Sequence, residues 1–213
     1  MVRYATGAIL WSAVTIATQL SAMAEGFDRD EVGAAPVGWS CGMTGQGAPL
    51  WSVEADMSAP SKPNVLLQSG SAAFPWCVKQ GKALTDGFVE TKLKPIVGNI
   101  DRAGGVVWRW KDAGSYYVAR ANELENNVTL YRMEQGVRKT LKRADAPVLQ
   151  GQWNILRVEF SGQRIRVLLN GQAYIETDDA HITGSGSIGV WTKADSMTAF
   201  DDFVFGEIGA GQK

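Results

Sequence analysis

Histidine and cysteine are scarce in this sequence. Its 213 residues include one histidine, His181, and two cysteines, Cys41 and Cys77. A zinc site built from His and Cys needs three or four such ligands, and a Ser-His-Asp triad needs a histidine that can act as a base. His181 lies in the turn-rich stretch TDDAHITGSG, where we expect a surface residue rather than a general base. The shortage argues against both kinds of catalytic centre.

The chain also lacks an excess of charge of either sign. It has 21 Lys and Arg against 22 Asp and Glu, and the basic residues are dispersed. Because a nucleic-acid surface depends on clustered positive charge, we expect no nucleic-acid partner. With 45% hydrophobic residues and no long polar tract, the chain can bury a sizeable core, and one globular domain is expected.

The longest apolar run lies at the N-terminus. MVRYATG carries Arg3 and no acid, AILWSAVTIATQL is almost wholly apolar, and SAMA ends in the small residues that signal peptidase favours. We predict a signal peptide over residues 1–24, cleaved after Ala24, and a single domain over residues 25–213. The alternative is an uncleaved membrane anchor, but the run is shorter than the roughly 20 apolar residues that span a bilayer. The expected location is periplasmic or extracellular, without membrane contact after cleavage.

Export would place Cys41 and Cys77 in an oxidising compartment with no third cysteine in the sequence to compete. We therefore predict a disulfide between them. Closing a loop of about 35 residues stabilises a fold by roughly 3–4 kcal/mol in the chain-entropy picture. The alternative is two separate buried thiols, because spacing alone does not show that the two Cα atoms approach each other.

Beyond Glu25 the hydrophobic pattern has a period of two. Short segments rich in Val, Ile, Tyr, Trp and Phe, such as NVTLYRM, WNILRVEF and GSIGVWTK, are separated by turn signals. This pattern predicts an all-β antiparallel sandwich or barrel with little helix. Asn170 and Gly171 predict a two-residue hairpin turn. Trp39 and Trp153 are expected in the core.

Two arginines mark a candidate polar face. In GVVWRW the larger apolar residues share one face of the strand, and Arg109 points to the other face. In YYVARAN the alternation places Arg120 and Asn122 on the same face of the strand. This phase predicts that Arg109 and Arg120 lie side by side on one sheet. One interpretation is a structural salt bridge, for example to Glu125 or Asp195. The other is a sugar site, in which Arg, Asn and Asp side chains bind hydroxyl groups.

The stretch SIGVWTKADS supplies the aromatic part of that site. Ile188 and Val190 share a face, so Trp191 and Lys193 point the other way. We predict that Trp191 stacks on a sugar ring and that Lys193 and Asp195 bind the sugar at its edges. The alternative places Trp191 in the core and Lys193 on the surface, because a phase error of one residue reverses the assignment.

Acidic residues near both ends of the domain suggest a structural metal site. In FDDFVF, Asp201 falls in phase with Phe203 and Phe205, where an unpaired carboxylate is costly to bury. Asp201 or Asp202, with oxygen atoms around Asp28, would suit a calcium ion that ties the first strand to the last. An arginine partner for Asp201 is the alternative.

Long stretches of the chain resemble a known superfamily. The segments AGGVVWRWKDAGSYYVARANELENN and NGQAYIETDDAHITGSGSIGVWTKADS are similar to concanavalin A-like lectins and glucanases. The similarity is strongest to secreted bacterial proteins related to family 16 glycosidases or described as 3-keto-disaccharide hydrolase-like. The resemblance implies a jelly-roll sandwich with one sheet curved into a groove. The catalytic pattern E-x-D-x-x-E of the retaining glucanases is missing from this sequence.

Three functions follow from these observations. The first is an exported protein that binds a saccharide or polysaccharide on its concave sheet, without obvious catalytic residues. The second is a glycan-active hydrolase or lyase, which only the family resemblance supports. The third is a structural or adhesive exported protein. The glycan and the oligomeric state are left open at this point.

Overall fold

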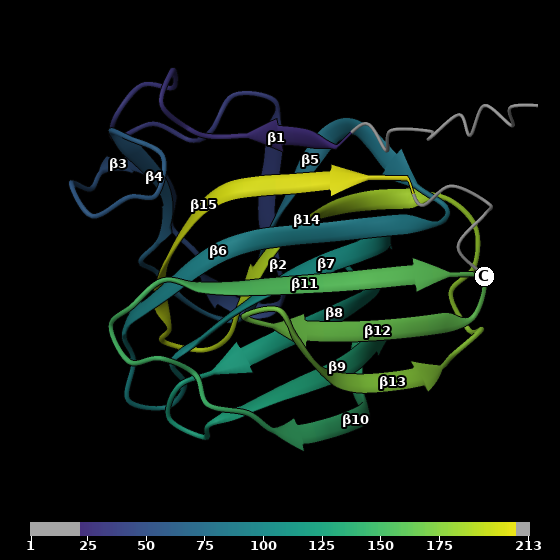
Figure 1. The fold of residues 1–213 in the computed structure, drawn as a ribbon. Coiled ribbons are helices and arrows are strands. Elements are labelled where there is room, and N and C mark those ends of the chain that lie inside the picture. The colour runs from purple at the N-terminus through teal and green to yellow at the C-terminus, as the bar shows by residue number, and fades with distance from the viewer. Residues whose placement is uncertain (1–21, 208–213) are drawn as a thin grey trace, which may run out of the picture.

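The computed structural model describes residues 22–207, and most of the predicted signal peptide, residues 1–21, lies outside this range. The described residues form fifteen β-strands and no helix (Figure 1), and therefore include no helix that is long and apolar enough to cross a membrane. The first sheet contains β1 (Met23–Glu25), β3 (Trp51–Ala55), β4 (Asn64–Gln68), β6 (Gly87–Val97), β11 (Asn154–Ser161), β12 (Arg164–Leu169), β13 (Gln172–Asp178) and β15 (Met197–Gly206). The second sheet contains β2 (Trp39–Ala48), β5 (Ser71–Leu84), β7 (Ala103–Asp112), β8 (Ser115–Asn122), β9 (Asn127–Glu134), β10 (Val137–Asp145) and β14 (Gly186–Thr192).

The two sheets form the layers of an antiparallel sandwich. The first has the order β13-β12-β11-β6-β15-β4-β3, with β1 beside the far end of β15, and the second has the order β10-β9-β8-β7-β14-β5-β2. Strands that neighbour each other in space, such as β6 and β15, are often far apart in sequence, as in a jelly roll. The predicted all-β jelly-roll sandwich is confirmed.

Alternating residues of both sheets fill the core between them. Trp108 of β7 stacks on Tyr117 of β8 at 5.3 Å between ring centroids and on Phe160 of the opposite sheet at 5.9 Å. Ile188 and Val190 of β14 are fully buried in the same core, as their alternation predicted. Each such buried side chain contributes about 1.5–3 kcal/mol.

Two local predictions about covalent and turn structure are confirmed. Cys41 and Cys77 face each other in the register of β2 and β5 and form a disulfide. Asn170 and Gly171 connect β12 to β13 with positive φ angles of 50° and 81°, which is the geometry of a type I′ hairpin turn.

Trp39 lies in the main core, as predicted, but Trp153 does not. Trp153 packs beside a small cluster that contains Ala59, and its Nε1 donates to the carbonyl oxygen of Ser58 at 2.7 Å. The core prediction for Trp153 is therefore wrong.

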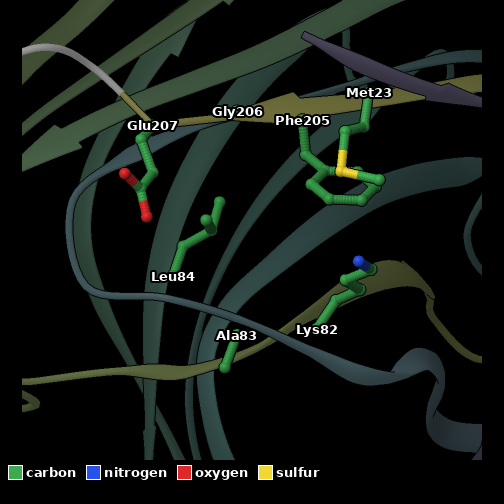
Figure 2. A pocket seen from close by; sticks show the side chains of 7 residues that line it. All are labelled: Met23, Lys82, Ala83, Leu84, Phe205, Gly206 and Glu207. Atoms are coloured by element: carbon green, nitrogen blue, oxygen red, sulfur yellow. The ribbon is translucent and has the colours of Figure 1, made fainter. Parts of the chain in front are cut away.

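The predicted cleavage site after Ala24 lies within the N-terminal strand β1. Met23 and Ala24 pair with Phe205 and Val204 of β15, so cleavage after Ala24 would remove two of the three residues of β1. Met23 also forms one wall of a cavity of about 360 Å³, which is shown in Figure 2. The lining consists of Met23, Lys82, Ala83, Leu84, Phe205, Gly206 and Glu207.

Candidate functional site

The outer face of the second sheet, which points away from the core, is concave. The side chain of Arg138 on the edge strand β10 lies 4.9 Å from the ring centroid of Phe74 on β5. Five strand spacings separate these two strands in the sheet order, which is about 24 Å in a flat sheet. That is farther than an arginine and a phenylalanine side chain reach together. The sheet must therefore curve, and we call this surface the concave face.

An aromatic layer covers the middle of the concave face. It consists of Phe74, Trp76, Trp110, Tyr116, Tyr131 and Trp191, packed with Val78, Val107, Val118 and Met133. The phase of β14 therefore places Trp191 on this face, as predicted. However, Trp191 is 0% exposed and lies beneath Phe74, with the two rings nearly parallel and 5.9 Å apart. The prediction that Trp191 stacks directly on a sugar is wrong for this conformation, and the half-buried Phe74 occupies that position.

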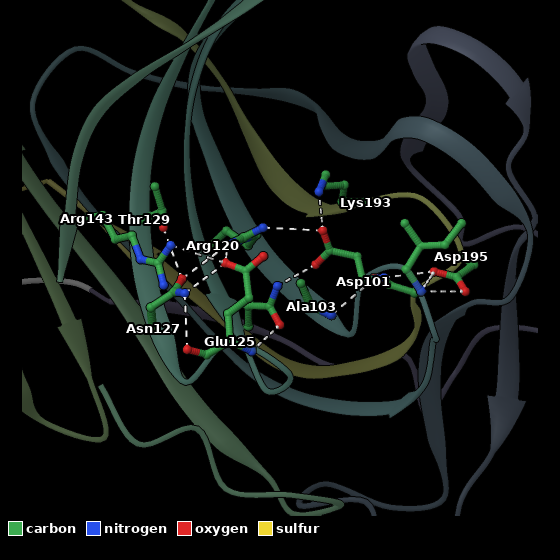
Figure 3. A network of polar contacts seen from close by, with 12 residues as sticks. Asp101, Ala103, Arg120, Glu125, Asn127, Thr129, Arg143, Lys193 and Asp195 are labelled. Atoms are coloured by element: carbon green, nitrogen blue, oxygen red, sulfur yellow. Dashed lines mark hydrogen bonds and ion pairs between the residues drawn. The ribbon is translucent and has the colours of Figure 1, made fainter. Parts of the chain in front are cut away.

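Polar side chains gather at one end of the same face, and Figure 3 shows them around Asp101. Asp101 is fully buried in the loop between β6 and β7. It accepts a hydrogen bond from Asn122 at 2.6 Å, pairs with Arg120 at 3.4 Å, and pairs closely with Lys193. Three of the predicted ligand-binding residues are therefore brought together, on an aspartate that the sequence analysis did not identify.

Glu125, in the turn between β8 and β9, holds the other side of Arg120. The two side chains are 2.9 Å apart, and Asn127 donates to Glu125 at 2.8 Å. Arg143 of β10 lies 3.8 Å from the same carboxylate. Burial raises the pKa of Glu125, but the hydrogen bond from Asn127 and the charge of Arg120 lower it more, so the pKa lies below its usual value. Of the two interpretations of Arg120, the salt bridge is present with Glu125 as a partner, and nothing here tests the sugar contact.

Asp195 has a supporting position in the loop after β14. Its carboxylate accepts hydrogen bonds from the backbone amides of Asn99 at 2.7 Å, Ile100 at 3.1 Å and Asp101 at 3.0 Å. Burial raises the pKa of Asp195, but these amide hydrogen bonds lower it more. Asp195 thus holds the loop that carries Asp101, and Lys193 pairs with Asp101 rather than with Asp195.

Arg109 lies away from this cluster. The strand register places Gly105, not Arg109, opposite Arg120, so the prediction that the two arginines lie side by side is wrong. Arg109 has a positive φ of 47° at an irregularity in β7, and this bulge also moves Trp110 to the concave face, out of phase with Trp108.

The Arg109 guanidinium instead joins three loops by hydrogen bonds at the opposite end of the sandwich. It donates to the carbonyl oxygens of Gly162 at 2.7 Å, Ile182 at 3.1 Å and Thr85 at 3.1 Å. These three acceptors lie in three different inter-strand connections, so one buried cation holds the connections together.

Several buried N–H groups on the concave face have no acceptor among the described residues. They are the Nε1 atoms of Trp76 and Trp110, Nε of Arg120 and Nη1 of Arg138. Nε1 of Trp191 has the hydroxyl of Tyr116 as its partner. Trp51, Trp108 and Arg132 carry similar unpaired donors elsewhere in the described chain. Buried donors without an acceptor are costly, so the four on this face leave it with an unmet capacity for hydrogen-bond acceptors.

The predicted calcium ligands are in contact with protein donors. Asp201 accepts hydrogen bonds from the backbone amide and the hydroxyl of Ser61 at 2.8 and 2.7 Å, Asp202 pairs with Lys92, and Asp28 accepts from the amide of Asn64. Within residues 22–207, no three Asp, Glu, His or Cys side chains gather in a way that suits a metal. A calcium ion would have to displace these donors, so the calcium site stays a prediction.

A second polar cluster surrounds Asp179 at the far end of the sandwich. Asp179 pairs with Arg132 at 2.6 Å, accepts from the hydroxyl of Tyr117, and lies 3.1 Å from Nδ1 of the exposed His181. Burial raises the pKa of Asp179, but the hydrogen bonds from Tyr117 and the His181 amide lower it more. Burial also raises the pKa of Tyr117 to about 12. This cluster ties the loop before β14 to β8 and β9.

Arg138 and Phe74 are residues that the sequence analysis missed. Gln135 and Gly136 form a two-residue turn with positive φ angles, which places Arg138 opposite Met133. Continuing the alternation of NVTLYRM across that turn would have identified Arg138. No local pattern marks Asp101, because it lies in a loop and its partners come from other segments.

Comparisons with known proteins concern the fold. No protein-family model matches the sequence, and no curated protein matches it significantly. The carbohydrate-binding module CBM66 from Bacillus subtilis has a similar structure, with a TM-score of 0.66 and 18% identity over 80% of this chain and 96% of that chain.

Two further structures have the same architecture. A β-glucanase from Bacillus licheniformis has a TM-score of 0.57 and 11% identity over 88% of this chain and 98% of that chain. The exoplasmic/lumenal domain of VIP36, in a Ca²⁺/Man3GlcNAc-bound form, has a TM-score of 0.59 and 10% identity over 83% of this chain and 86% of that chain. The chain therefore has the concanavalin A-like β-sandwich fold.

Proposed function

We propose that this protein binds a saccharide on its concave face. The observation that carries the proposal is the set of four buried N–H donors, on Trp76, Trp110, Arg120 and Arg138, which have no acceptor among the described residues and lie among aromatic rings. Sugars match such a surface, because hydroxyl oxygens accept hydrogen bonds and the C–H faces of sugar rings pack on aromatic side chains. The fold is compatible with this function, since it is shared by a carbohydrate-binding module, by the VIP36 domain in its Man3GlcNAc-bound form and by a putative glycosyl hydrolase.

Within the face, the aromatic and polar parts have different roles. The fully buried Trp191 stacks on Phe74, and the guanidinium of Arg138 lies over the same ring, so the half-buried Phe74 offers a ligand its exposed part together with Arg138. The network of Asp101, Arg120 and Asn122 fixes the direction of the polar groups at one end. A rigid arrangement of this kind reduces the entropy cost of binding.

A glycan array followed by titration calorimetry tests the proposal. We expect Phe74→Ala to weaken binding of the best glycan at least tenfold while the protein stays folded. Trp153→Ala is the matched control, because Trp153 is also half-buried but lies outside the concave face. Absence of binding to any glycan, or equal losses in the two variants, would reject the proposal.

A glycan-active hydrolase or lyase is the other function that the names of fold neighbours suggest. The carboxylates of the concave-face network weigh against it. Asp101 is fully buried, and both Asp101 and Glu125 are paired with Arg120. Retaining hydrolysis needs two carboxyl groups about 5–5.5 Å apart and open to the substrate, so we favour binding.

We also propose that the protein is exported. The disulfide between Cys41 and Cys77 is compatible with an oxidising compartment, and the N-terminal sequence has the composition of a signal peptide. Intact mass spectrometry of the protein recovered from the periplasm or medium tests this. A full-length chain that stays in the cytoplasm would reject it.

A further inference from the structure

Arg138 is an arginine of the concave face that has no acidic partner within residues 22–207. Its guanidinium lies 4.4 Å from the ring centroid of Tyr131 and 4.9 Å from that of Phe74. Among the described residues it makes no ion pair, and its Nη1 is buried without an acceptor. The two rings stabilise its charge through their π faces, which do not replace an oxygen acceptor for its N–H groups.

Two buried arginines of this chain, in contrast, have carboxylate partners. Arg120 pairs with Asp101 and Glu125, and Arg132 pairs with Asp179 and Glu134. A guanidinium with buried N–H groups and no acceptor is costly, and an acceptor from a ligand would remove that cost. Arg120 and Arg132 also have a buried Nε without an acceptor, but each has two carboxylates beside it. Arg138 is therefore the position where a ligand would supply a carboxylate that the described residues do not.

The cations of the concave face differ in what lies beside them. Asp101 and Glu125 supply carboxylates to Arg120, Arg143 and Lys193. Arg138 has the rings of Phe74 and Tyr131 beside it, and no ion pair joins it to a carboxylate of the described residues. A carboxylate from a ligand would therefore meet a cation that the described chain leaves without one.

We infer that the concave face selects a saccharide whose ring carries a carboxylate. The inference rests on the proposed function and names its ligand class. The guanidinium fork of Arg138 matches a carboxylate with two parallel N–H···O bonds, which a lysine ammonium cannot reproduce. Phe74 and Tyr131 hold the guanidinium over their rings, so a sugar whose carboxylate binds the fork would lie against the exposed edges of these two side chains.

Pairs of oligosaccharides that differ only in the carboxylate test this inference. The probes are oligomers of galacturonate, glucuronate, mannuronate and guluronate, each beside its carboxyl-reduced, neutral form, together with sulfated oligosaccharides. We expect the wild-type protein to bind at least one uronate oligomer tenfold or more tightly than its reduced form.

Variants of one strand identify the residue responsible. Arg138→Gln should remove the preference for the uronate while binding of the reduced form persists, and Arg138→Lys should restore only part of it. Lys139→Gln is the matched control, because it removes the same charge from the next residue of β10, whose side chain pairs with Glu134. The control should keep the preference, and thermal unfolding of each variant verifies that it is folded.

The outcomes separate the inference from the proposed function. Binding of neutral glycans with no uronate preference would overturn the inference and leave saccharide binding intact. A stronger preference for sulfate than for carboxylate would overturn the carboxylate assignment. Binding of no glycan at all would overturn both.

Discussion

Replacement of Trp191 by alanine should destabilise the fold rather than act on ligand binding alone. The side chain is 0% exposed and packs between the second sheet and the ring of Phe74, 5.9 Å away. Deleting a buried tryptophan side chain costs roughly 3–5 kcal/mol. In a domain of this size each kcal/mol lowers the melting temperature by about 2–4 °C, which predicts a fall of roughly 6–20 °C.

Urea denaturation and thermal unfolding, followed by circular dichroism, measure this effect. Val37→Ala is the control, because Val37 is 74% exposed and its truncation should change the free energy of unfolding by less than about 0.5 kcal/mol. A loss below about 1 kcal/mol for Trp191→Ala, together with loss of glycan binding, would refute the reasoning. It would show that Phe74 moves aside and that the ring of Trp191 contacts the ligand.

The other predictions concern charge and covalent structure. Asp101→Asn should cost about 3–5 kcal/mol in urea denaturation, because it removes the buried negative charge that pairs with Arg120 and Lys193; a loss under 1 kcal/mol would contradict this. Reducing the disulfide between Cys41 and Cys77, 36 residues apart, should lower stability by about 4 kcal/mol on the chain-entropy estimate, and melting curves with and without reductant measure it. The lowered pKa of Asp179 means that its stabilisation is complete above the unfolded value of about 3.9 and is lost as the pH falls through the folded pKa. Asp179→Asn should therefore flatten the decline in melting temperature below pH 4, and an unchanged decline would argue against this role. If calcium binds at Asp201, a chelator should lower the melting temperature of the wild type but not of Asp201→Asn. The free energy of unfolding should fall by about 2.7 kcal/mol relative to a hundredfold excess of calcium over its dissociation constant. An unchanged curve would reject the calcium site.

The fold was predictable because its signals are local and repeat many times. Alternation in each strand fixes which side chains face the core, as Ile188 and Val190 do, and the Asn170-Gly171 turn fixes one hairpin register. A single error in such a pattern leaves the other strands correctly assigned. The jelly-roll topology itself came from the resemblance, since period-two segments alone fit several sandwiches.

The site was harder to predict because it depends on exceptions to alternation. Arg109 adopts a positive φ inside a strand, which no residue type in GVVWRW indicates, and this changes the face of every later side chain in β7. The same problem occurs in β15, where Asp202 has a φ of 45° and Asp201 is turned to the Ser61 loop instead of the core. Bulges of this kind decide which polar residues reach a face. A candidate site that is derived from alternation alone therefore includes wrong residues and omits correct ones after each bulge.

The acidic residues of the concave face favour binding over hydrolysis for an electrostatic reason. A glycosidase needs one carboxylic acid that stays protonated near neutral pH, so its pKa must be raised. Glu125 has the opposite property, because Asn127 and Arg120 hold its pKa below the usual value. Asp101, buried among Arg120, Asn122 and Lys193, orients cations and an amide. The carboxylates of this network therefore act on protein groups, and the donors that are left without acceptors, above all Arg138, are the groups that a ligand can use.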